Sequence, residues 1–134
     1  MTNIVLPQPR HILSFAQTLR GGGVERALLR LAGGWAARGQ RVTLVIGDAS
    51  GPLVGELPTG VVTVVLGDAR YRAMLGIAGR VRALDPDVIF CPGNHYSAVA
   101  AMLRLRLGRD CPPIVGKVSN ALVRDDQPAP IAWG

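Results

Sequence analysis

Three consecutive glycines, Gly21 to Gly23, separate an apolar run from a segment with helical periodicity. Residues 11–16 are predicted to form a short buried strand, and Val24 begins a helix expected to reach Arg38. Glycine has no Cβ, so such a junction turns sharply and lets a ligand approach backbone N–H groups. The first turn of the helix adds unpaired N–H donors and the positive end of the helix dipole, which suit a phosphate. A tight turn without a ligand explains the same residues, so other parts of the chain must decide between the two interpretations.

Apolar runs continue to alternate with helical patterns along the chain. We expect further strands at 41–47, 61–66, 88–91 and 114–118, helices at 71–84 and 95–107, and a loop at 48–60. Strands that alternate with helices imply right-handed crossovers and a parallel sheet. The sequence therefore predicts an α/β fold: a single Rossmann-like, three-layer domain with a mainly parallel sheet and strand order 3-2-1-4-5.

Helical spacing also predicts which side chains face the core. On the first helix they are Val24, Leu28, Leu31, Ala32 and Trp35; on the second, Met74, Ile77, Ala78, Val81 and Leu84; on the third, Val99, Met102, Leu103 and Leu107. Gly33 and Gly34 are poor helix formers, so we expect close packing against the first helix there.

The predicted strand order has a switch point between the first and fourth strands. Ligands of such folds bind there, beyond the carboxyl ends of the strands. Gly21 to Gly23 follow the first strand and Gly93 to His95 follow the fourth. Both loops are therefore expected to line one crevice, which favours a ligand site over a simple turn.

The composition indicates one folded domain spanning residues 1–134, with a loop-like tail at 121–134. Hydrophobic residues make up 49% of the chain and charged residues 18%, a composition that excludes an intrinsically disordered chain. The net charge is +6, and Lys117 is the only lysine. A basic balance alone does not identify a partner, and we expect no nucleic-acid binding because no recognition motif accompanies it.

The sequence indicates neither a metal centre nor a membrane anchor. Cys91 and Cys111 lack CxxC spacing, and His11 and His95 have no ligand-like neighbours, so we expect reduced thiols and no metal. No apolar run reaches the length of a membrane span, which favours a cytoplasmic protein.

A dinucleotide site is one alternative for the glycine loop. Its fingerprint is G-x-G-x-x-G, and Arg26 stands where the last glycine should be. Asp48, at the end of the second strand, has the place of a ribose-binding acid. The chain also lacks the Gly-Lys-Ser/Thr of a Walker phosphate loop.

The arrangement resembles the N-terminal domain of family 4 (group 1) glycosyltransferases of the GT-B fold. The resemblance covers roughly residues 10 to 127 and is carried by four stretches: GGGVER with the following LL and LA at 21–32, AARGQRV at 36–42, DPDVI at 85–89 leading to NHY at 94–96, and VSNAL at 118–122. The first two are fairly specific to that group, whereas PDV alone is common.

The resemblance implies retaining transfer of a sugar from a nucleotide-diphosphate-sugar donor to an acceptor, without a cofactor or metal. Backbone groups of Gly21, Gly22, Gly23 and Val24 would approach the donor diphosphate. The acceptor, a carbohydrate or a lipid-linked sugar, would contact Asn94, Tyr96, Ser119 and Asn120 on this side of the cleft. His95 is the candidate catalytic side chain, orienting an acceptor hydroxyl or the donor sugar.

The chain departs from the family pattern at two places. Relatives carry paired glutamates eight residues apart in a donor domain, whereas this chain has only Glu25 and Glu56. Many relatives have a histidine after the fifth strand, where this chain has Val118 and Ser119. We therefore expect the 134-residue chain to be inactive alone; a non-catalytic or NAD(P)-binding Rossmann-like module remains the alternative function.

Structural explanations compete with several of these roles. His95 and Asn120 also suit a helix start and a turn, and Glu25 suits the first turn of a helix. Arg104, Arg106 and Arg109 form either a solvated helix face or a peripheral contact with an anionic inner membrane surface. The fifth strand ends the predicted sheet, and an exposed edge there favours a homodimer.

Overall fold

Five strands form one parallel sheet in residues 10–116, the part of the chain that the computed structural model describes. The strands are β1 (His11–Thr18), β2 (Arg41–Asp48), β3 (Val61–Val65), β4 (Val88–Cys91) and β5 (Ile114–Gly116). Their order across the sheet is β3-β2-β1-β4-β5, and every neighbouring pair is parallel. The predicted α/β class and strand order are confirmed, and the switch point lies between β1 and β4.

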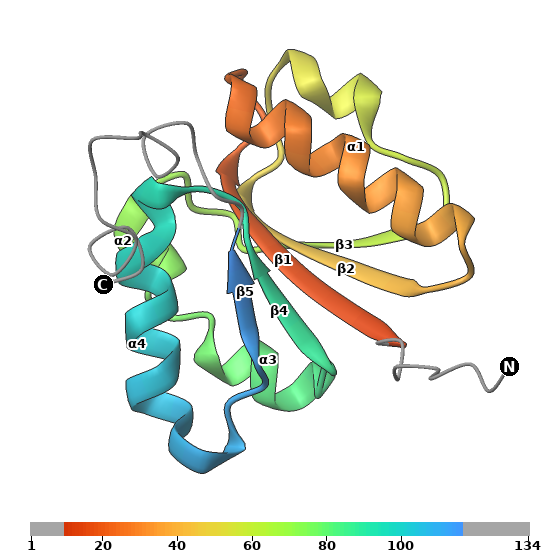
Figure 1. Cartoon of the computed structure of the whole chain (residues 1–134). Helices are drawn as coiled ribbons and strands as arrows, with labels where there is room; N and C mark the ends of the chain where they lie inside the picture. The colour runs from red at the N-terminus through yellow and green to blue at the C-terminus, as the bar shows by residue number, and fades with distance from the viewer. Residues whose placement is uncertain (1–9, 117–134) are drawn as a thin grey trace, which may run out of the picture.

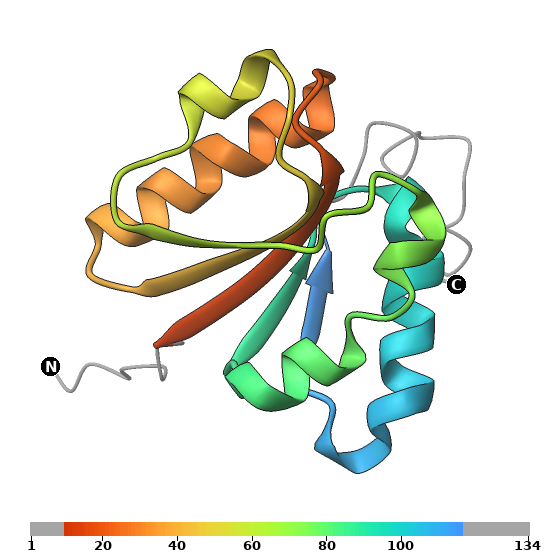
Figure 2. The same ribbon diagram turned by 180° about the vertical axis from the view of Figure 1, so that it is seen from behind.

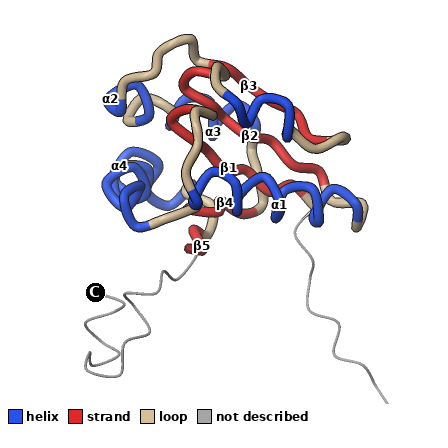
Figure 3. Tube along the Cα trace, turned by 90° about the horizontal axis from the view of Figure 1, so that it is seen from above, coloured by secondary structure: helices blue, strands red, loops and turns tan. Residues whose placement is uncertain are grey.

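Helical segments cover both faces of the sheet (Figure 1). One face carries α1 (Gly23–Ala37) and the 3-10 turn η1 (Pro52–Glu56), as the view from behind also shows (Figure 2). The other face carries α2 (Tyr71–Met74), α3 (Ala78–Leu84) and α4 (Ser97–Leu107). The 3-10 turns η2 (Asn94–Tyr96) and η3 (Gly108–Asp110) stand at the two ends of α4. Figure 3 shows α2 and α4 on the same side of the molecule, away from α1.

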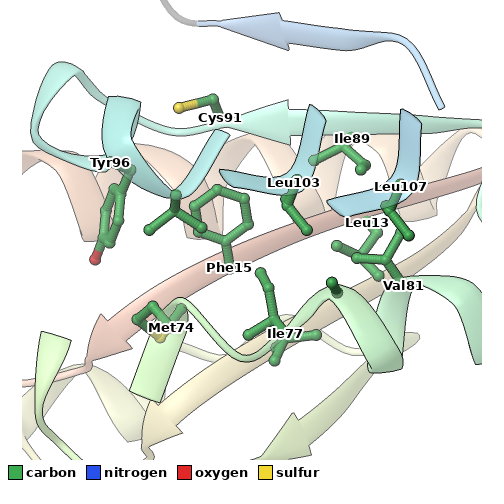
Figure 4. Close-up of a cluster of buried hydrophobic side chains, with 13 residues drawn as sticks. Leu13, Phe15, Met74, Ile77, Val81, Ile89, Cys91, Tyr96, Leu103 and Leu107 are labelled. Atoms are coloured by element: carbon green, nitrogen blue, oxygen red, sulfur yellow. The ribbon is translucent and has the colours of Figure 1, made fainter. Parts of the chain in front are cut away.

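The sheet separates two hydrophobic clusters, because strand side chains alternate between its faces. The α1 face buries Leu28, Leu29 and Ala32 of the helix against Ala16, Leu19, Val42, Leu44, Ile46 and Leu53. On the other face, Leu13, Phe15 and Ile89 pack against residues of α2 to α4, among them Met74, Val81, Val99, Leu103 and Leu107 (Figure 4). Few aromatic side chains take part, so branched aliphatic packing supplies most of the core.

The structure places α1 differently from the prediction. Leu29 is buried and Leu31 is 37% exposed, whereas Leu31 was expected to face the core. Leu28, Leu29 and Leu31 allow two overlapping apolar stripes at helical spacing, so periodicity alone could not choose between them. The expected close packing occurs at Gly33, where an added Cβ would lie 3.3 Å from Pro58, but not at Gly34, where an added Cβ would meet no atom within 4 Å.

The predicted helix 71–84 is divided into α2 and α3. Between them the N–H groups of residues 75–77 bond to carbonyls three residues earlier, so the chain tightens into a 3-10 turn. That turn places Met74 and Ile77, three residues apart, together in the core. Smaller differences are that β1 extends to Thr18 and that the helix expected from His95 begins as η2.

Some predictions concern residues that the structure leaves undescribed. Residues 117–118 of the predicted fifth strand and the tail at 121–134 lie outside the described part, so the single-domain assignment stays a prediction. Across residues 10–116, no helix has both the length and the apolar character needed to cross a membrane.

Candidate functional site

The glycine loop connects the end of β1 to the first turn of α1. Gly21 has φ 140° and Gly22 has φ 111°, conformations that residues with a Cβ rarely adopt. Gly22 is the N-cap of α1, and no side chain caps that helix start. A Cβ added at Gly21 or Gly23 would meet no atom within 4 Å, so the backbone at these two positions is uncrowded. Backbone conformation therefore explains two of the three glycines, and the open space leaves a ligand room to approach.

The turn after β4 lies directly against the start of α1. A Cβ added at Gly93 would lie 3.1 Å from both methyl carbons of Val24. Gly93 is buried, whereas Asn94 and His95 after it are exposed. The two loops that the strand order predicted to meet are therefore neighbours at the carboxyl edge of the sheet.

The hydroxyl of Tyr96 connects three segments at this edge. It accepts a hydrogen bond from the backbone N–H of Gln17, at 2.7 Å, and donates one to Oε2 of Glu25, at 3.1 Å. Burial is the main cause that raises the pKa of Tyr96, and the Glu25 carboxylate adds to the shift although the Gln17 N–H opposes it. The phenol is therefore neutral and acts as the donor toward Glu25.

His95 stands beside this connection with half of its side chain exposed. Its Nε2 lies 3.8 Å from Oε2 of Glu25, whose side chain is only 12% exposed. The imidazole lies against the Tyr96 ring, with centroids 4.0 Å apart, and the Tyr71 hydroxyl donates to the His95 carbonyl oxygen at 2.7 Å. The ring is thus supported from one side and open to solvent on the other.

The comparison with protein families identifies the family of this chain. The model of Glycosyltransferase Family 4 matches residues 21–117, most of the chain, beginning at the first glycine of the loop. The chain belongs to glycosyltransferase family 4. No match was found among curated proteins. A glycosyltransferase-type function follows from the family, and such an activity requires a sugar donor and an acceptor.

Not every predicted site residue of this family 4 domain is placed where an acceptor could reach it. Asn94 and His95 are exposed at the carboxyl edge. Tyr96 differs from the expectation, because its side chain is fully buried and its hydroxyl is occupied by Gln17 and Glu25. Ser119 and Asn120 lie outside the described residues.

Gln17 is a residue of this site that sequence reasoning missed. Its backbone N–H bonds to Tyr96, and its side-chain amide donates to the carbonyl oxygen of Ala69 at 2.8 Å. Glu25 was expected to favour the helix dipole, and the structure adds two partners to that role. The hydrogen bonds of Gln17 and Glu25 give no signal in the sequence, because each joins residues more than 50 positions apart.

Two aspartates extend the carboxyl edge toward β3. Asp48 accepts hydrogen bonds from Arg20 and from the backbone and hydroxyl of Ser50. Hydrogen bonds from Arg70 lower the pKa of Asp68 to about 2. Over residues 10–116, no three His, Cys, Asp or Glu side chains are grouped as metal ligands would be.

Proposed function

We propose that this chain is the acceptor-side domain of a retaining glycosyltransferase that uses a nucleotide-diphosphate sugar. In that reaction the anomeric carbon exchanges its bond to a diphosphate oxygen for a bond to an acceptor hydroxyl oxygen. The hydroxyl proton passes to an oxygen of the departing diphosphate, on which negative charge develops. The domain's task on this proposal is to bind that charge and to present the acceptor.

One observation carries the proposal: the uncapped start of α1 follows two positive-φ glycines beside the turn that bears His95. The first N–H groups of a helix lack intrahelical partners, and the helix dipole is positive at that end. Backbone groups of Gly21, Gly22, Gly23 and Val24 would therefore donate to diphosphate oxygens, with no cofactor or metal. Donors fixed before the reaction stabilise developing charge effectively, because they need no reorganisation.

On the acceptor side, the exposed residues of η2 support a role in presenting the acceptor. His95 has a half-exposed ring held beside Glu25, which suits a group that orients a sugar hydroxyl. Asn94 is exposed next to it. Ser119 and Asn120, outside the described residues, stay candidates for acceptor binding. Tyr96 would contribute by positioning its neighbours, since its own side chain is buried.

The family resemblance puts the reaction between two domains, so we propose that residues 1–134 alone bind a donor without completing transfer. We also propose a cytoplasmic enzyme whose acceptor is a carbohydrate or a lipid-linked sugar. Exposed Arg104 and Arg106 on α4, followed by Arg109, support peripheral contact with an anionic membrane. Cosedimentation with vesicles containing anionic lipid, against neutral vesicles, tests that contact; equal binding to both would refute it.

The donor site can be tested by NMR titration of the ¹⁵N-labelled chain with UDP, GDP and inorganic pyrophosphate. We expect the amide signals of Gly21 to Val24 to shift most, and Gly22→Ala to weaken binding at least tenfold. The substitution strains a positive φ, and its Cβ would lie 2.8 Å from Oε1 of Glu25.

Gly39→Ala is the matched control, because Gly39 also has a positive φ, 87°, but follows the opposite end of α1. It should cost stability without weakening binding. Shifts confined to other regions, or equal weakening by both variants, would contradict the proposal. Tight binding of NAD(P) at the loop would instead support the dinucleotide module.

A further inference from the structure

We propose that Tyr96 is a positioning residue whose hydroxyl holds the glycine loop in its ligand-binding shape. The ligand-binding part of this inference rests on the proposed donor site. The claim that Tyr96 holds the loop in place does not depend on any ligand. Its basis is that one oxygen atom bonds to residues on both sides of the same loop.

The two bonds of the Tyr96 hydroxyl bracket the loop. Gln17, which donates its N–H to that oxygen, lies just before the loop, and Glu25, which accepts its proton, lies just after it. A phenol has one proton to donate and also accepts hydrogen bonds, so this hydroxyl is used in both capacities. The loop therefore begins and ends at residues fixed to a common point.

Both ends of the bracket are themselves restrained. The Gln17 side chain is tied to Ala69, on the connection before α2. Oε1 of Glu25 lies where a Cβ at Gly22 would be crowded, so the carboxylate also borders the loop backbone. Displacement of either residue would consequently change the backbone that the diphosphate is proposed to meet.

The Tyr96 ring is well placed to hold the hydroxyl still. It is completely buried and meets the Phe15 ring edge-on, with centroids 5.4 Å apart, while the Tyr71 ring stacks on it at 6.3 Å. Figure 4 shows Tyr96 at the border of the buried cluster, with its hydroxyl oxygen pointing away from the cluster. Rigid support of this kind keeps a binding site preorganised.

The bracket also accounts for a carboxylate close to a proposed anion site. Glu25 is unfavourable as a direct contact of a diphosphate, but its side chain is only 12% exposed, accepts the proton of the Tyr96 hydroxyl and lies beside the His95 ring. Glu25 on this reading is an anchor of the loop whose charge is directed toward the phenol and His95.

The test compares Tyr96→Phe with Ser14→Ala. Both remove a buried hydroxyl, and Ser14 bonds to the Phe90 carbonyl oxygen inside the sheet, away from the loop. Tyr96→Phe removes the partner of the Gln17 N–H, so amide hydrogen exchange at Gln17 should be about tenfold faster than in the wild type. Ser14→Ala should leave the exchange rate of Gln17 unchanged. Pyrophosphate and UDP should bind about tenfold more weakly to Tyr96→Phe than to the wild type, and equally to Ser14→Ala and the wild type.

A second pair of variants covers the case in which Tyr96→Phe does not fold. Glu25→Ala removes the acceptor, whereas Glu25→Gln keeps an oxygen that can accept from Tyr96. We expect Glu25→Ala to bind pyrophosphate and UDP as weakly as Tyr96→Phe does, and Glu25→Gln to bind them about as well as the wild type. Unchanged Gln17 exchange, or unchanged binding in both Tyr96→Phe and Glu25→Ala, would overturn the positioning role.

The two proposals fail in distinguishable ways. If wild-type chain binds neither pyrophosphate nor UDP at the loop, the proposed donor site is wrong. Hydrogen exchange at Gln17 and the amide signals of Gly21 to Gly23 would still show whether Tyr96 holds the loop.

Discussion

Val24, at the start of α1, and Gly93, after β4, are in direct contact across the carboxyl edge of the sheet. A Cβ at Gly93 would lie 3.1 Å from both Val24 methyl carbons, closer than most such contacts. Gly93 has φ −173°, which any residue adopts, so the constraint on this position is the approach of α1. The lack of a side chain at Gly93 lets the first turn of α1 lie this close to the turn that bears His95.

We expect Gly93→Ala to destabilise the fold by about 1–2 kcal/mol, because the added methyl overpacks the contact with Val24. Urea unfolding measures the loss. Val24→Ala should relieve the crowding, so the double variant should be more stable than the sum of the single changes predicts, by about 1 kcal/mol. Strict additivity would show that the two residues are not coupled.

Gly47 in β2 should tolerate substitution even less. Its Cβ would lie 2.6 Å from the backbone oxygens of both Gln17 and Asp68, and neither backbone can move without disturbing the sheet. We expect Gly47→Ala to cost about 3 kcal/mol in unfolding free energy. Gly34→Ala is the control: Gly34 lies within α1 with nothing within 4 Å, so alanine should stabilise the helix by up to about 1 kcal/mol. Equal effects of the two changes would argue against the crowding at Gly47.

His11 should make folding stability depend on pH. Burial is the main cause that lowers its pKa, Arg41 lowers it further, and Asp87 and Asp85 oppose the shift. The unfolded state then binds a proton more readily than the folded state, so stability should fall as the pH drops below about 6.5. Urea unfolding from pH 7.5 to 5 measures this loss. His11→Gln should abolish it, and substitution of His95 should not; a slope that persists in His11→Gln would contradict the assignment.

The hydrogen bond between His11 and Thr43 should contribute to folding stability, which can be measured at constant pH. The Thr43 hydroxyl lies 2.8 Å from Nε2 of His11, and both residues are buried. Thr43→Val keeps the shape but leaves the imidazole nitrogen without this partner, which should cost about 1–3 kcal/mol at pH 7.5. A cost below about 0.5 kcal/mol in urea unfolding would indicate that the bond contributes little to stability.

Arg70 should control the titration of Asp68. Its side-chain hydrogen bonds are the largest cause that lowers the pKa of Asp68 to about 2, ahead of the bond from its backbone N–H. Arg70→Ala keeps the backbone bond, so the pKa should rise only part of the way to its ordinary value, as NMR of the carboxyl carbon would measure. Arg72→Ala removes only a minor charge effect and should change little. Comparable shifts in the two variants would mean that general charge, not the hydrogen bonds, sets the value.

Local patterns were sufficient to predict the order of the sheet. Residues 42–47 are apolar or small on both faces and are all buried, as expected of a strand covered by helices on both sides. Gly21 and Gly22 marked the junction that has positive φ angles. Periodicity failed for Leu29 and Leu31, because two stripes fitted the spacing equally and only packing against the sheet and η1 selected one.

The amino-acid sequence by itself determined the alternation of strands and helices, the glycine loop after β1 and the family resemblance that the family model confirmed. These depend on residue types close together along the chain, where backbone sterics and burial act locally. The tertiary structure alone decided that Tyr96 is buried and bonded to Gln17 and Glu25, 79 and 71 positions away. No local pattern encodes such bonds, because they form only when the sheet brings the ends of β1, β4 and α1 together.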